Sequence, residues 1–92
     1  MTFEKSIYYQ EIINLINLSE FKKAKIILED NKNQFADDYL FFTTLGYIHD
    51  HLHEYQDSEL NYIKALNLNN HFYDAKFNLA VLYYKLKNYL RW

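Results

Sequence analysis

The sequence predicts an all-α fold made of antiparallel helical hairpins. Its 92 residues contain no proline and one glycine, so almost nothing in the chain forbids a helix. Apolar residues recur at the i, i+3, i+4 spacing of helices, and the alternation typical of strands is not sustained anywhere. The polar breaks between the apolar sets are short, and short connections join helices that run antiparallel.

Five helices of roughly 11–15 residues are expected, with the beginning of a sixth at the C-terminus. A polar break follows the apolar set of each expected helix. The five sets begin, in chain order, at Ile12, Phe21, Phe41, Tyr55 and Phe77. The breaks comprise residues 18–20, 31–34, 53–54, 67–71 and 87–88.

Composition excludes several classes of function. The chain contains no cysteine, which removes disulfides and thiolate metal sites and fits a reducing, cytoplasmic location. Its formal net charge of -2 comes from interleaved acids and bases, so a nucleic-acid partner is not expected. The N-terminal residues show no pattern of a secretion signal. The longest apolar run, residues 79–84, is too short for membrane insertion.

The chain matches itself after a shift of 34 residues. The breaks coincide under this shift, and so do aromatic, apolar and small residues. The matched residues include Phe21 with Tyr55 and Tyr89, Leu45 with Leu79, and Gly46 with Ala80. The repeating unit is therefore a pair of antiparallel helices.

Residues 39–72 carry the clearest unit, and they resemble the tetratricopeptide repeat (TPR) family. The pattern Phe42-x-x-Leu45-Gly46 is similar to the W-x-x-L-G motif of that family, with Phe in place of Trp. The ending KALNLNN, residues 64–70, looks like the family's KALELNP. Further matching positions are Tyr55, which opens the second helix, and Ser58, Tyr62 and Ala65.

The resemblance implies one domain over residues 1–92. It would be a short right-handed TPR-like solenoid of stacked hairpins, with about two and a half to three repeats. The units would span residues 5–38, 39–72 and 73–92, the last being incomplete. The first unit departs from the motif at Glu11-Ile12, where Leu-Gly is expected, and the third departs at Lys76, where a bulky residue is expected.

The residue types predict how such a hairpin packs. A small residue at Gly46 and at Ala80 would let the two helices of a unit approach closely. Phe42 and Tyr62 would fill the space between helices. Ala65 would permit close packing against the following unit.

The resemblance also implies a concave surface, lined by the first helix of each unit, that binds a peptide or a helix. The projected lining is mostly apolar and aromatic, which suits the apolar face of an amphipathic helix. It consists of Tyr9, Ile13, Ile16, Leu40, Tyr47, His51, Phe77, Val81 and Tyr84, together with the polar residues Ser6, Asn17, Thr43, Asp50, Asp74 and Lys85. The alternatives are that these residues form the core of a small stack, or that a neighbouring copy or a C-terminal helix fills the groove.

Some TPR proteins clamp the carboxylate of an acidic C-terminal tail with basic residues. At the matching positions this chain carries Tyr9, Ile13, Thr44, Asp74 and Asn78. A carboxylate would lose its water there without gaining a cation, so binding of acidic tails is not expected.

Three histidines, His49, His51 and His53, raise the question of a metal site. On a helix His49 and His53 share a face, but His51 points to nearly the opposite side, so the three cannot converge on one ion. His49 falls on Tyr83 in the repeat, which predicts a packing role. We expect no metal and no cofactor. No nucleophile constellation or phosphate loop is present, so enzyme activity is not expected either.

The sequence therefore predicts a non-enzymatic protein-interaction module or chaperone that cradles an apolar helix of a partner. In size and groove it is similar to the small TPR-like chaperones of type III secretion needle subunits. The alternative is a self-associating scaffold or a subunit of a larger assembly, in which a homodimer covers an apolar end formed by Phe77, Leu86, Tyr89 and Trp92.

Overall fold

The computed structural model describes the backbone of residues 3–90 and the side chains of residues 7–87. Within that range the chain is all-helical, with no strand, which confirms the predicted fold class. Tyr89 and Trp92, expected at an apolar end, and Ser6, expected in the groove, lie outside the described side chains. The helices are α1 (Phe3–Asn17), α2 (Phe21–Asp30), the short 3₁₀ helix η1 (Lys32–Phe35), α3 (Tyr39–His51), α4 (Tyr55–Leu68) and α5 (Tyr73–Leu90).

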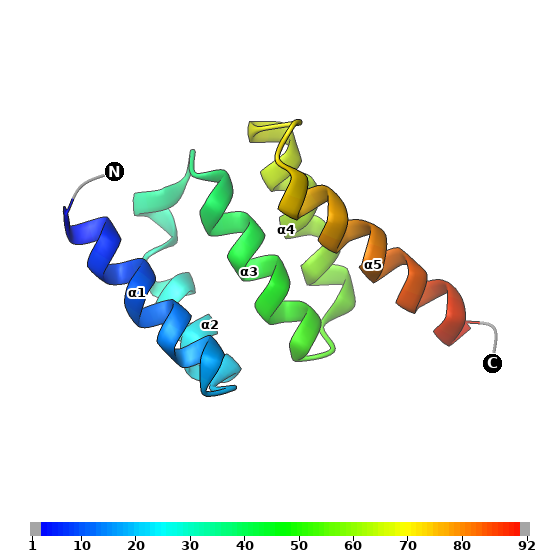
Figure 1. Ribbon diagram of the computed structural model, residues 1–92, viewed down its shortest axis with the longest axis horizontal. Coiled ribbons are helices and arrows are strands. Elements are labelled where there is room, and N and C mark those ends of the chain that lie inside the picture. The colour runs from blue at the N-terminus through cyan, green and yellow to red at the C-terminus, as the bar shows by residue number, and fades with distance from the viewer. Residues whose placement is uncertain (1–2, 91–92) are drawn as a thin grey trace.

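The helices lie in two layers (Figure 1). Helices α1, α3 and α5 are nearer the viewer, and α2 and α4 lie behind them. Each α-helix packs against the next one in the chain, and α3 also contacts α5. The α1–α2 and α3–α4 turns lie along the lower edge of the view, and the other two connections lie along its upper edge. The successive helices are therefore antiparallel.

The predicted break at residues 87–88 and the sixth helix after it are wrong. Helix α5 runs without interruption through both positions to Leu90. Lysine is a good helix former, and a single asparagine lowers helix stability by a fraction of a kcal/mol, roughly 0.7 at most relative to alanine. The break expected at residues 31–34 is present between α2 and α3, but most of it forms the 3₁₀ helix η1 and is not irregular.

The backbone repeats with the spacing that the sequence predicted. Helices α2 and α4 begin 34 residues apart, and so do α3 and α5. Ser19 and His53, also 34 residues apart, both have positive φ, at 59° and 62°. The N–H of each donates to the carbonyl three residues earlier, and the next N–H donates to the carbonyl five residues earlier, at 2.8 to 3.0 Å. Both hairpins thus turn through the same Schellman motif.

The α3–α4 hairpin is centred on Gly46. A Cβ at this position would lie 2.7 Å from the ring of Tyr62, so only glycine permits this approach of the helices. Ser58 Oγ donates to the Gly46 carbonyl at 2.7 Å, and Phe42 is fully enclosed beside them. The close approach predicted at Ala80 is wrong, because Ala80 is exposed and no described helix follows α5 to cover it.

Candidate functional site

Two adjoining hollows form a groove across the front layer of helices. The first has a volume of about 400 Å³ and lies between α1 and α3. The second has a volume of about 230 Å³ and lies between α1, α3 and α5. Ile16 and Thr44 line both hollows, so the two are continuous.

The first hollow has an apolar floor and a fixed polar edge. Ile13 lines it and is 48% exposed, so part of its aliphatic side chain is available for contact in a concave place. The Tyr9 hydroxyl donates to Asp38 Oδ2 at 2.8 Å. Asp38 also accepts from the N–H of Leu40 at 2.9 Å and so caps α3. Burial, together with the carboxylate of Asp38, raises the pKa of Tyr9.

The second hollow is lined by aromatic rings and by polar groups that accept hydrogen bonds. Tyr73 and Phe77 stack one turn apart on α5, with ring centroids 6.0 Å apart, and Tyr47 faces the same hollow from α3. The remaining lining residues are Ile16, Thr43, Thr44, Asp74 and Asn78.

Six of the nine apolar and aromatic residues predicted for the groove line these hollows: Tyr9, Ile13, Ile16, Leu40, Tyr47 and Phe77. The other three, His51, Val81 and Tyr84, are exposed but lie outside both linings. Gln10, Ile12 and Tyr73 also line the groove and were missed. The i, i+4 spacing of Tyr73 and Phe77 was the signal that could have identified Tyr73.

Asp50 does not project into the groove. It is buried in α3, and Lys85 Nζ of α5 lies 3.1 Å from its Oδ2. A buried carboxylate needs such a partner, because burial of an unpaired charge costs several kcal/mol. Removing one partner of a buried ion pair destabilises a protein by roughly 3–5 kcal/mol. This ion pair therefore links α5 to α3 outside the lining of the second hollow.

The three histidines do not converge. His49 is buried, and its Nδ1 lies 2.8 Å from Glu54 Oε1. His51 stacks on Phe21, and His53 Nδ1 lies 2.6 Å from the Tyr55 hydroxyl. Among the described residues, no group of three or more histidine, aspartate and glutamate side chains could hold a metal ion. The packing role predicted for His49 is confirmed by its burial.

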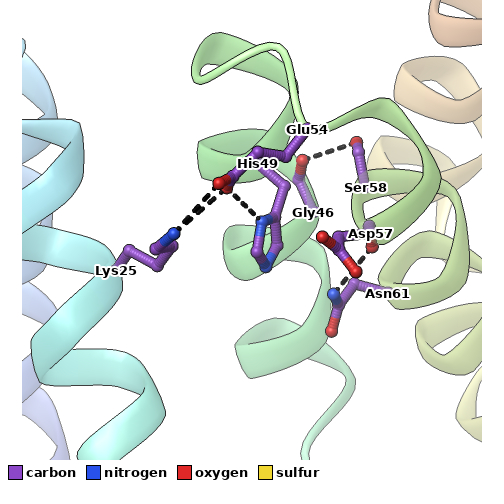
Figure 2. A network of polar contacts seen from close by, with 7 residues as sticks. All are labelled: Lys25, Gly46, His49, Glu54, Asp57, Ser58 and Asn61. Atoms are coloured by element: carbon purple, nitrogen blue, oxygen red, sulfur yellow. Dashed lines mark hydrogen bonds and ion pairs between the residues drawn. The ribbon is translucent and has the colours of Figure 1, made fainter.

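His49 belongs to a polar network where α2 meets the α3–α4 turn (Figure 2). Lys25 of α2 reaches across to Glu54, with Nζ 3.1 Å from Oε2. The hydrogen bond from His49 lowers the pKa of Glu54, burial opposes this effect, and Lys25 adds to it. The network couples the two hairpins on the side opposite the groove, and sequence spacing alone did not reveal it.

Comparisons of the chain with family models, curated proteins and solved structures found no match. No helix within residues 3–90 combines the length and the apolar character needed to cross a bilayer. The TPR resemblance therefore rests on the chain's own residues and on its 34-residue backbone repeat.

Proposed function

We propose that this chain is a TPR-like, non-enzymatic interaction module whose groove holds the apolar face of an amphipathic helix from another protein. The observation that carries the proposal is the continuous groove across α1, α3 and α5. The 34-residue repeat of Schellman turns supports a TPR-like arrangement, because helical-hairpin units of that length are typical of the family.

The exposed side chains of the groove match the needs of a helical partner. Ile13 and Phe77 remain 48% and 46% exposed, one in each hollow. A bound helix would place anchors at i, i+3, i+4 and i+7, which is the spacing that reaches both hollows from one face. Burying such side chains contributes roughly 1.5–3 kcal/mol each, so a few contacts suffice for a specific complex.

A selection of helical peptides from a displayed library tests this function. We expect enrichment of sequences with apolar residues at i, i+3, i+4 and i+7. Ile13→Asp and Phe77→Asp should each abolish binding with unchanged helicity, because both side chains are largely exposed in the unbound chain. Leu60→Asp, which changes a 63% exposed leucine on α4 outside the groove lining, is the matched control and should bind normally. Binding that survives both groove substitutions contradicts the proposal.

The needle-subunit chaperone role is a narrower form of the same proposal. Its mechanism would be sequestration, because burial of a polymerising helix in the groove keeps the partner soluble. The specific test is whether a needle-type helical segment binds and whether Phe77→Asp releases it.

A self-associating scaffold is the second candidate. Apolar residues that are exposed outside the groove lining favour it, namely Leu60, Ile63 and Tyr83. A concentration-dependent dimer in sedimentation, disrupted by Leu60→Asp, would support this role, whereas a monomer at all concentrations would contradict it.

A further inference from the structure

The second hollow has the chemistry of a site for an organic cation. We infer that it binds the ammonium or guanidinium head of a lysine or arginine side chain carried by the partner helix. This inference rests on the proposed function and adds a charge requirement to it. Three features carry it: the acceptors in the hollow, its aromatic rings, and its continuity with the apolar part of the groove.

Thr43, Thr44 and Asp74 give the hollow hydrogen-bond acceptors, and Asn78 adds an amide that both donates and accepts. The hydroxyls of Thr43 and Thr44 donate to the carbonyls of Tyr39 and Leu40, at 2.8 and 2.7 Å, so their oxygens present lone pairs. Asp74 adds a carboxylate. No lysine, arginine or histidine is among the lining residues that the structure describes. An anion placed here would therefore meet the like charge of Asp74 and find no basic side chain in the lining.

Neither Lys76 nor Lys85 of α5 pairs with Asp74. Lys76 stands two positions from Asp74, where helical side chains do not face each other, and it is not part of the lining. Lys85 Nζ lies 3.1 Å from Asp50 Oδ2, and Lys85 is not part of the lining. Asp74 makes no ion pair with any other described residue. The charge of Asp74 is thus available to a cation from outside.

The aromatic rings favour an organic cation over a metal ion. Tyr73 is 72% exposed and Phe77 is 46% exposed, and their stacked rings line the same hollow as Asp74. A cation within about 6 Å of a ring centroid is attracted by the ring quadrupole. Hard metal ions instead need several oxygen ligands, roughly six to eight for calcium. Ammonium and guanidinium groups can use both the rings and the acceptors.

Size and position identify the source of the cation. The hollow of about 230 Å³ is smaller than the roughly 300–1,000 Å³ of typical small-molecule pockets, and it suits the head of one side chain. It continues into the apolar first hollow through Ile16 and Thr44. One helix can therefore place an apolar face in the first hollow and a basic residue in the second.

A titration followed by NMR tests the hollow without any helix. The probe is N-acetyl-lysine amide, and the neutral control is N-acetyl-norleucine amide, both at constant ionic strength. We expect saturable shifts of the Tyr73 and Phe77 rings and of the Asn78 amide with the lysine probe only. Asp74→Asn should weaken this binding about twofold to fivefold. Asp57→Asn, which changes the first-turn acid of α4, is the matched control and should leave it unchanged.

The peptide selection then separates this inference from the proposed function. Helices enriched by the unmodified chain should carry Lys or Arg at one fixed position. A selection with the Asp74→Lys variant should instead enrich helices with Asp or Glu at that position. Bound helices without a basic residue overturn the inference and leave the proposed function standing. Equal shifts from the two NMR probes also overturn it. Failure to select any helix contradicts the proposed function. In that case, NMR shifts with the lysine probe that depend on Asp74 would still support a cation site.

Discussion

The ring of Tyr62 lies so close to Gly46 that a Cβ at position 46 would be 2.7 Å from both Cδ1 and Cε1 of the ring. Tyr62 is completely buried, so its ring has no free space into which to move. This contact determines how closely α3 and α4 pack, and it accounts for the single glycine of the chain.

Gly46→Ala should therefore destabilise the protein, although alanine is the better helix former. The gain in helix propensity is roughly 1 kcal/mol. Overpacking costs roughly 1–3 kcal/mol, so the expected net loss is up to about 2 kcal/mol in urea unfolding. In a Tyr62→Leu background the obstruction is smaller, and the same substitution should become neutral or stabilising. An increase in stability in the unmodified chain would contradict this packing.

Tyr62→Phe should stabilise the fold. Among the described residues, the Tyr62 hydroxyl is the buried side-chain group that finds no hydrogen-bond partner. Burial raises the pKa of Tyr62, and the nearby carboxylate of Asp50 adds to the rise. Removing an unsatisfied buried hydroxyl removes its desolvation penalty, so we expect a gain of about 1 kcal/mol.

Tyr8→Phe is the matched control for that substitution. The Tyr8 hydroxyl donates to the Ile27 carbonyl at 3.1 Å, so its loss should cost about 1 kcal/mol. Thermal unfolding of the two variants should therefore shift in opposite directions. A loss of stability in both would mean that Tyr62 has a hydrogen-bond partner in solution.

The same residues show what a sequence can and cannot predict. The α3–α4 hairpin was predictable, because Gly46, Phe42 and Tyr62 are local signals whose spacing is set by helix geometry. The Lys25–Glu54 ion pair was not, since its partners are 29 residues apart and meet only through packing of the hairpins. Asp50 was misplaced for a similar reason. Helical periodicity puts Asp50 near the groove face. In the structure Asp50 is buried between helices and forms an ion pair with Lys85 of α5.

Most of the predicted groove residues line a hollow, and they were projected from the TPR resemblance, which implies that one face of the first helix of each unit points inward. The residues of α5 at the edge of the groove were predicted less well, since the packing of α5 against α3 decides which of its side chains reach a hollow. Val81 and Tyr84 share a face with Phe77 by periodicity, yet neither reaches a hollow.

Ser19→Gly should stabilise the protein through the α1–α2 turn. Ser19 has a φ of 59°, a conformation that costs a non-glycine residue roughly 1–2 kcal/mol. Glycine removes this cost and loses roughly 0.5–1 kcal/mol in chain entropy, so the expected net gain is up to about 1.5 kcal/mol. Ser19→Ala, which keeps the strain, should give no gain in the same thermal unfolding measurement. Equal effects of the two substitutions would contradict the strained turn. His53→Gly should gain less, because it also loses the contact with Tyr55.

Glu54 should make the stability depend on pH in the acid range. The His49 hydrogen bond is the main cause that lowers the pKa of Glu54 below its ordinary value of 4.5. A carboxylate with a lowered pKa in the folded state stabilises the fold above that ordinary value, and the contribution disappears as the pH falls through the lowered pKa. Glu54→Gln should thus reduce stability at neutral pH by up to about 1 kcal/mol, a small effect because the side chain is partly exposed.

The control for Glu54→Gln lies 34 residues earlier. Glu20 occupies the same position in the first Schellman turn, but Leu15 stands where His49 stands in the second. Glu20→Gln should therefore change stability little at any pH. Urea unfolding of the two variants from pH 7 down to pH 3 checks this difference. The deficit of Glu54→Gln should shrink toward zero as the acid limit is approached, since Glu54 of the unmodified chain becomes protonated there. A deficit that persists unchanged at low pH would show that Glu54 acts through packing rather than through its charge.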